Sequence, residues 1–358
     1  MMTPVLNVDK PALRRIARGG AVLGSGGGGD PYIGRLMAEQ ELGDDKTVSV
    51  VSLDDLPDDA LILPIAMMGA PHVMLERFPS GNEIPALVAT MEKLMGRKVS
   101  AILCIEAGGL NSVIPFIAAA QMGLPIIDGD AMGRAFPELQ MVTFTLAGLN
   151  ATPMAMYDDK GNGATFDTVS NQWTERLARA LTIEMGGAAM VGLYPVVAGD
   201  IRDCLIKGSL TLAHRIGDLI ETYGGQATET LASSLGGTML FHGRVRDVER
   251  RLEGAFAKGS VRIEGQGDFR GRTVTLGFQN EFLSAEEDGR MLATTPDLIT
   301  LIDANTGAPV PTDTVKYGLS VKVLGLPCDP IWRTEAALKL VGPRYFGIDA
   351  DYKPLDVA

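Results

Sequence analysis

A glycine-rich stretch near the start of the chain constrains its fold more than any other feature. Glycine fills five of the six positions 24–29, and an aspartate and a proline follow. The apolar residues 21–23 predict a short buried strand before the stretch. Residues 32–42 predict a helix after it, with Asp30 as N-cap and Pro31 at the first helical position. Such a loop offers backbone N–H groups to an anion or a polarised ligand. The alternative is a tight turn that needs several residues with positive φ.

The charge and composition of the chain exclude several classes of partner. The 358 residues carry a net charge of −12 and no basic run, which opposes binding to nucleic acid or to an anionic membrane surface. No apolar stretch is long enough to span a membrane, and the N-terminus lacks the apolar core of a signal peptide. Three widely spaced cysteines without a C-x-x-C pair are typical of a reducing compartment. We therefore expect a soluble cytoplasmic protein, assembled as a homo-oligomer.

Apolar runs alternate with helical patterns along the first part of the chain. Residues 47–53, 60–66 and 99–105 predict buried strands, and a first helix is predicted over 11–18, ended by Gly19-Gly20. This alternation is typical of an α/β fold with a mainly parallel sheet. We assign residues 1–165 to this domain.

The pattern changes after residue 165. A long helix is predicted over 201–222, with Asp200 as its N-cap, and short strands separated by turns follow from residue 238. We therefore predict a second, α+β domain over residues 166–358, rich in antiparallel strands.

Polar side chains follow the apolar strands of the first domain. Because the carboxyl ends of strands in open α/β sheets form the ligand crevice, these side chains are expected to converge on one edge of the sheet. They are Asp30, His72, Glu106, Asn111, Asp128 and Asp130. The last two form a carboxylate pair, which can hold a metal, share a proton or divide acid and base roles. The alternative is a turn in which Asp130 caps a helix from Ala131.

Two further features keep alternatives open. The glycines match G-x-G-x-x-G, and Asp54 lies where a ribose-binding acid would sit, so a dinucleotide is one reading. Such a match is nearly unavoidable in so many glycines, and Asp30 places a carboxylate where a pyrophosphate would approach.

Cys328 stands between two prolines, and the neighbouring Asp329 raises the pKa of its thiol, so it is not an activated nucleophile on local grounds.

Six segments resemble, in the same order, segments of one known family. They are LGSGGGGDP (23–31), EAGGLN (106–111), PIIDGDAMGR (125–134), GFQNEF (277–282), TPDLI (295–299) and PCDP (327–330). Together they resemble the S-methyl thiohydantoin desulfurase family, from Pro11 to Leu355. The resemblance implies a three-layer α/β N-terminal domain and a β-rich C-terminal domain. It also implies hydrolysis of the C–S bond of an S-methyl thiohydantoin to a hydantoin and methanethiol.

That reaction needs a base for water, a donor for a ring nitrogen and N–H groups for a ring oxygen. We assign Asp128 or Glu106 as the base and His72 as the donor or acid. The backbone of Gly26, Gly27, Gly28 and Gly29 would hold the ring carbonyl or a carboxylate on its substituent. The remaining substrate contacts are assigned to Asp30, Asn111, Asp130, Asn280, Cys328 and Asp329.

Two rival interpretations remain. No cofactor is expected, but a metal-bound water is the rival mechanism, with a divalent ion such as zinc held by side chains whose spacing indicates no metal motif. Those side chains are Asp30, His72, Asp128 and Asp130. The competing class is a nucleotide- or small-ligand-binding protein without catalysis, associated with hydantoin metabolism.

Overall fold

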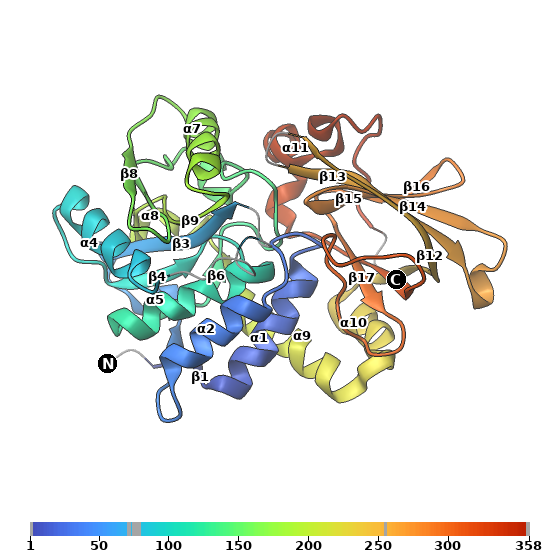
Figure 1. Ribbon diagram of the computed structural model, residues 1–358, viewed down its shortest axis with the longest axis horizontal. Coiled ribbons are helices and arrows are strands. Elements are labelled where there is room, and N and C mark those ends of the chain that lie inside the picture. The colour runs from blue at the N-terminus through green and yellow to red at the C-terminus, as the bar shows by residue number, and fades with distance from the viewer. Residues whose placement is uncertain (1–2, 70–72, 74–79, 254–255, 356–358) are drawn as a thin grey trace.

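Two sheets lie side by side in the molecule (Figure 1). The computed structural model describes residues 3–69, 73, 80–253 and 256–355. The first sheet has nine strands and lies in the blue-to-green part of the chain. The second has seven strands and lies in the orange-to-red part.

The first sheet has a parallel centre. Its central strands, in spatial order, are β2 (Val48–Val51), β5 (Ile126–Ile127), β4 (Ala101–Cys104) and β3 (Leu61–Gly69). They are apolar and almost fully buried, as strands between two helical layers must be. β1 (Leu6–Val8) adds an antiparallel edge, so three of the four pairings before residue 128 are parallel. The predicted parallel sheet is confirmed there.

Later strands extend this sheet on its other side, all antiparallel to their neighbours. They are β9 (Ala188–Gly192), β7 (Met154–Tyr157), β8 (Gly163–Phe166) and the short β10 (Val196–Val197) beside β3. The first sheet therefore takes in strands beyond residue 165, from the segment that the sequence assigned to the second domain.

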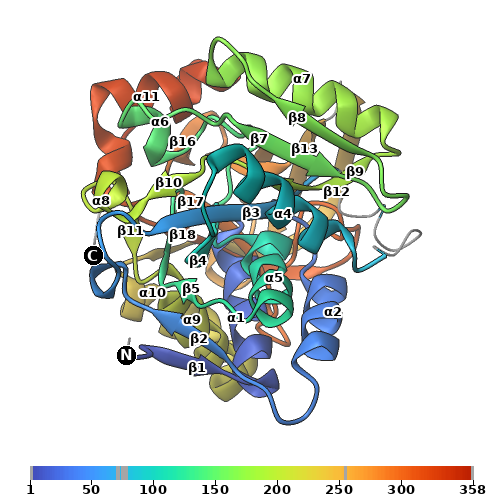
Figure 2. The same cartoon turned by 90° about the vertical axis from the view of Figure 1, so that its left-hand side faces the viewer.

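Helices cover the first sheet. In Figure 1 α7 lies above β3 and α5 lies below it, and Figure 2 shows α2 beside α5. The helices associated with this sheet are α1 (Lys10–Leu23), α2 (Tyr32–Leu42), α4 (Glu83–Met95), α5 (Ile114–Met122), α6 (Thr143–Leu146), α7 (Asn171–Glu184), α8 (Ala198–Ile201) and α9 (Ser209–Tyr223). The result is the predicted three-layer arrangement.

The start of the chain differs from the prediction. α1 continues through Gly19 and Gly20 and includes residues 21–23, which were predicted as a strand. A Cβ atom at Gly19 would overlap the carbonyl of Ala213 on α9, and one at Gly20 would overlap the hydroxyl of Ser112. The two glycines therefore allow α1 to pack closely and do not end it. The glycine-rich loop consequently joins two helices.

The long helix predicted over 201–222 is also wrong. The chain forms α8, then the short strand β11 (Ile206–Lys207), and only then α9. β11 pairs with β6 (Gly129–Asp130), and Gly208 turns the chain between β11 and α9 with a φ of +80°. The apolar residues between positions 201 and 219 resemble one helical stripe because those of α8, β11 and α9 pack into the same hydrophobic core.

The second sheet is antiparallel throughout and curls on itself, so that β15 also contacts β17. Its strands are β12 (Thr238–Glu253), β13 (Phe256–Gly265), β14 (Thr273–Gln279), β15 (Glu281–Glu287), β16 (Arg290–Thr294), β17 (Leu298–Asp303) and β18 (Ser320–Leu326). Helices α10 (Ala227–Leu235) and α11 (Glu335–Val341) flank it. The predicted antiparallel C-terminal part is confirmed.

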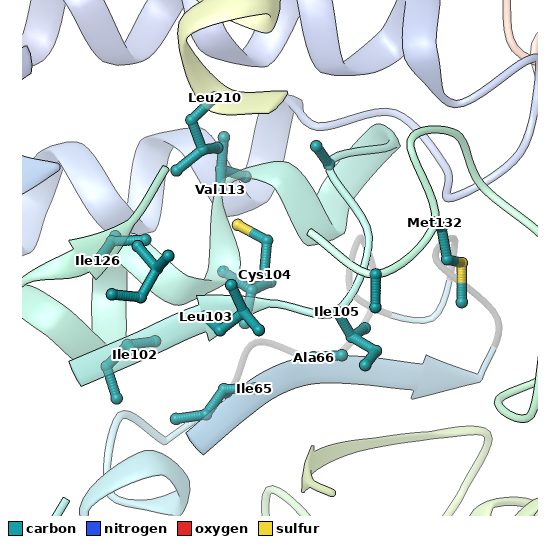
Figure 3. Packing of buried hydrophobic residues seen from close by; sticks show 14 of the residues in the cluster. Ile65, Ala66, Ile102, Leu103, Cys104, Ile105, Val113, Ile126, Met132 and Leu210 are labelled. Carbon is teal, nitrogen blue, oxygen red and sulfur yellow. The ribbon is translucent and has the colours of Figure 1, made fainter. Parts of the chain in front are cut away.

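The main hydrophobic core runs from the first sheet into the second through Leu298, Leu324 and Trp332. Figure 3 shows its centre, where the Cys104 side chain points toward Val113 and Leu210. Cys104, Cys204 and Cys328 are all free and buried, and burial raises the pKa of each thiol. No helix in the described part of the chain is both long and apolar enough to cross a membrane.

Candidate functional site

A cavity of about 170 Å³ lies where the two sheets meet. Its walls come from the glycine-rich loop, the carboxyl ends of β3 and β4, α7, the β12–β13 hairpin and the turn between β14 and β15. The sequence-predicted residues that line it are Gly26, Gly27, Gly28, Gly29, Glu106, Asn111 and Asn280. The apolar part of the wall includes Met67, Met132, Phe136 and Met154.

The glycine-rich loop is fastened to the second sheet. The Phe282 N–H donates to the Ser25 carbonyl over 2.7 Å, and the Thr312 N–H donates to the Gly26 carbonyl over 2.9 Å. A Cβ atom at Gly27 would overlap the Glu281 carboxyl, so Gly27 permits this close approach. The loop is therefore a junction between the two sheets.

Glu106 follows β4 and is 7% exposed. The Asn111 side chain fixes it, because Asn111 Nδ2 donates to Glu106 Oε1 over 2.7 Å while Asn111 Oδ1 accepts from the Met67 N–H over 2.8 Å. Burial raises the pKa of Glu106 to about 8, the Asn111 hydrogen bond opposes this, and the charge of Asp130 adds to it. Glu106 thus becomes a base only near that pH.

Glu281, at the start of β15, also lines the cavity and is 3% exposed. Its Oε2 atom is buried and has no hydrogen-bond partner among the described residues. Burial, together with the nearby charge of Glu106, raises the pKa of Glu281 to about 8. A buried oxygen without a partner is costly, which indicates a place for a ligand atom.

Glu106 and Glu281 can take different roles in proton transfer. The charge on either carboxyl disfavours ionisation of the other. Asn111 donates a hydrogen bond that favours the charged form of Glu106, whereas Glu281 Oε2 has no such partner among the described residues, so Glu106 is the one favoured to ionise first. Two neighbouring carboxyls whose pKa values are pushed apart form a general base and a general acid. The cavity therefore offers a candidate base and a candidate acid.

Arg134 is fully buried behind the site and joins its segments. Its guanidinium donates to the carbonyls of Phe282, Pro296 and Asp297, and lies 4.8 Å from the centre of the Phe136 ring. Burial lowers its pKa to about 10, so it stays charged at neutral pH. Its positive charge opposes the upward shifts in the pKa of Glu106 and Glu281.

Two family models match almost the whole chain. One is described as S-Me-THD-like, N-terminal domain, and matches residues 11–168. The other is described as S-Me-THD-like, C-terminal domain, and matches residues 169–355. The chain belongs to the S-Me-THD-like family. The resemblance to the S-methyl thiohydantoin desulfurase family is thereby confirmed.

A crystal structure of a Chromobacterium violaceum protein, solved as a structural-genomics target, resembles this S-Me-THD-like protein. The TM-score is 0.82, with 23% sequence identity, and the match covers 98% of this chain and 100% of the other. At this identity the likeness shows the fold alone. No functionally curated protein matches the sequence.

The structure places the Asp128–Asp130 pair outside the cavity lining of the S-Me-THD-like protein. The Asp128 carboxylate accepts hydrogen bonds from the N–H groups of Leu210 and Thr211, and so caps α9. Asp130 accepts from the Ala107 N–H over 2.8 Å and from the Ser209 hydroxyl over 2.5 Å, and burial raises its pKa to about 6. No helix starts at Ala131, so the capping role falls to Asp128 and not to Asp130.

Three other predicted contacts lie elsewhere. Asp30 is exposed, and its carboxylate accepts from the Tyr32 N–H, while Pro31 occupies the N-cap position of α2. Asp329 caps the short 3-10 helix Pro330–Arg333. Cys328 is buried outside the cavity lining, and its N–H donates to Asp297. Burial, with the charge of Asp297, raises the pKa of its thiol to about 11.

Two predicted residues need separate mention. Asn280 lines the cavity with a φ of +57°, but its Oδ1 atom accepts from the Ala257 N–H and so holds the β12–β13 hairpin. His72 lies outside the described residues. Its assigned role as donor stays a prediction.

The two rival ligands can be compared with the geometry. Asp54 pairs with Arg202 and Lys207 and does not line the cavity, and the glycines do not follow a strand, so a Rossmann arrangement is absent. Within the described part of the chain, no group of three or more His, Cys, Asp or Glu side chains is placed to hold a metal ion. The expectation of no cofactor stays a prediction, and metal analysis of the purified protein tests it against the rival zinc ion.

Sequence reasoning missed Glu281, Arg134 and Arg179. The first two lie within segments that carry the family resemblance, GFQNEF and PIIDGDAMGR, so a signal was present. Arg179 lies on α7 among other charged residues and carries no signal of its own. It lines the cavity because α7 packs beside the end of β3.

Proposed function

We propose that this S-Me-THD-like protein hydrolyses the C–S bond of an S-methyl thiohydantoin, giving a hydantoin and methanethiol. The observation that carries the proposal is the pair of buried carboxyls, Glu106 and Glu281, that line one cavity. Family membership supplies the substrate class. A cavity of about 170 Å³ suits a small ring, and its Met67, Met132 and Met154 side chains suit a methylthio group.

The mechanism starts with ionised Glu106, which takes a proton from water as the water oxygen attacks the carbon that carries sulfur. Glu281 donates its proton to the adjacent ring nitrogen, so no full charge builds up on the ring. The intermediate then returns its hydroxyl proton to Glu281 as the new carbonyl forms. The C–S bond breaks, and the departing thiolate takes the proton from Glu106. The net change is addition of water and release of methanethiol.

The glycine-rich loop contributes binding groups. The N–H groups of Gly28 and Gly29 form no hydrogen bond with the described residues. Gly28 and Gly29 have φ values of +68° and +72°, and both line the cavity. In the proposal these N–H groups bind a polar atom of the ring or of its substituent.

The pH dependence of kcat follows from the carboxyl pair. Because burial raises the pKa of Glu106 to about 8, its base form is populated only as the pH rises through that value. We therefore expect a bell-shaped profile of kcat near pH 8, which rises as Glu106 ionises and falls as Glu281, whose pKa is also raised to about 8, loses its proton. In Glu281→Gln the fall should disappear while the rise remains. A rise near pH 4 to 5, the ordinary range of a glutamate, would contradict these roles.

Asp128 provides a contrasting variant, since it was the other base that the sequence predicted. Asp128→Ala is expected to lower the free energy of unfolding by about 1–2 kcal/mol, through loss of the α9 cap. Thiol release should stay within about twofold. Urea unfolding and the activity assay measure the two effects. Unchanged stability with lost activity would restore Asp128 as the base.

The function is tested by incubating the protein with S-methyl thiohydantoins and measuring released thiol. A thermal-shift panel of hydantoins and nucleotides, run in parallel, separates catalysis from binding alone. We expect thiol release and stabilisation by hydantoins. Stabilisation by nucleotides only, without thiol release, would overturn the proposal in favour of a binding protein.

A further inference from the structure

Arg179 is the only cation among the described residues that line the cavity. The charged side chains around it in the lining are acidic: Glu106, Glu138, Glu281 and Asp313. A guanidinium in such a place needs oxygen partners.

The guanidinium is held from three sides. Its Nε donates to Glu175 Oε1 over 2.6 Å, and its Nη2 donates to the Pro137 carbonyl over 3.1 Å. The ring of Phe256, on the hairpin from the second sheet, stacks against it at 4.8 Å. Its third nitrogen, Nη1, has no hydrogen bond with any described residue. Because the side chain lines the cavity and is held by these contacts, with 15% of it accessible, this nitrogen is available to a ligand.

The neighbours of Arg179 indicate the chemistry of that ligand. Glu175 already offsets its charge, and further acids line the same cavity, so the local field suits a polarised carbonyl oxygen. The positive charge of Arg179 also opposes the raised pKa of Glu281, which lines the same cavity. In a thiohydantoin ring, one nitrogen beside the reacting carbon is bonded to a carbonyl carbon. Negative charge that develops on this nitrogen is shared with the carbonyl oxygen.

We propose that Arg179 binds this ring carbonyl oxygen and stabilises the charge that develops on it during attack at the adjacent carbon. The inference rests on the proposed function, because it takes the substrate to be a thiohydantoin. Glu281 then serves the ring nitrogen, Arg179 serves the neighbouring oxygen, and Glu106 activates the water. The N–H groups of Gly28 and Gly29 are left for the substituent on the ring.

The test uses Arg179→Met with Arg176→Met as its matched control. Arg176 lies on the same helix, is exposed, stacks on Trp173 at 5.4 Å and does not line the cavity. Arg179→Met is expected to lower kcat/KM by about 100-fold, and added guanidinium ion should restore part of the activity. Because the charge that lowers the pKa of Glu281 is lost, the alkaline limb of the pH profile should move to higher pH while the acid limb stays in place. Arg176→Met should stay within about twofold. A loss below fivefold in Arg179→Met, or a larger loss that guanidinium does not restore, would overturn the proposal.

Calorimetry of hydantoin binding tests the Arg179 contact with the ring carbonyl independently of thiol release. Arg179→Met should weaken hydantoin binding by about tenfold or more, and Arg179→Lys, which keeps the charge but lacks the second terminal nitrogen, should weaken it as well. If the protein releases no thiol yet binds hydantoin through Arg179, the proposed reaction is overturned and the carbonyl site stands. If it releases thiol and either variant binds hydantoin like the wild type, the Arg179 proposal is overturned. The lysine variant keeps the test decisive if the methionine variant does not fold.

Discussion

Glu106→Gln is expected to lower kcat for thiol release by about 10³-fold, with little change in the fold. The amide keeps the size of the side chain, but it cannot take a proton from water, and general base catalysis is typically worth 10²- to 10⁴-fold. Asn111 remains able to hydrogen-bond the new side chain, so the end of β4 should keep its position. Steady-state kinetics and a melting curve measure the two properties.

Glu281→Gln is the companion variant. Its loss should be smaller, about 10²-fold, since an amide N–H can still donate a hydrogen bond to the ring nitrogen although it cannot transfer the proton. The double variant should lose about as much as Glu106→Gln alone, because the two groups act in one proton-transfer sequence. Near-wild-type activity in Glu106→Gln would exclude it as the base.

The second large effect is expected from Gly27→Ala. A methyl group at this position would overlap the Glu281 carboxyl, and Gly27 has no positive φ that would add backbone strain. The new Cβ must therefore displace Glu281, and a misplaced catalytic group typically costs about 10²-fold in rate. We expect this loss in kcat, together with a change in the alkaline limb of the pH profile that Glu281 controls.

A matched control for this variant is Gly192→Ala. A Cβ at Gly192, on β9, would lie 3.4 Å from Leu63 and Leu87, an ordinary van der Waals contact. Activity should be retained in this variant. If Gly27→Ala also retained its activity, the close approach of the loop to Glu281 would not matter for catalysis.

Local pattern alone predicted much of the fold. The apolar runs at β2, β3 and β4 and the alternating strands from β12 onward could be read directly, because burial sets their residue types. Tertiary contacts decided the rest. Gly19 and Gly20 resembled a helix end, but they serve the packing of α1 against α9 and the 109–112 turn. A single sequence carries no information about that close approach.

The site could be predicted only in part, because local topology places some of its residues and tertiary contacts place the others. Glu106 and Asn111 follow a buried strand, and the topology of parallel strands brings such residues to one edge. Asp128 follows a strand of the same sheet, but its carboxylate is taken up by the N-terminus of α9, about 80 residues later in the chain. Glu281 comes from the second sheet, and only the packing of that sheet on the glycine-rich loop brings it to the cavity.

The central claim is hydrolysis of a C–S bond by water, and oxygen labelling tests it most directly. An S-methyl thiohydantoin is incubated with the protein in ¹⁸O-labelled water, and the hydantoin and methanethiol are quantified by mass spectrometry. The account predicts one labelled oxygen in each hydantoin for every methanethiol released, with formation slowed about 10³-fold in the Glu106→Gln/Glu281→Gln variant. Thiol release at the rate of the protein-free solution, or hydantoin without the label, would contradict it.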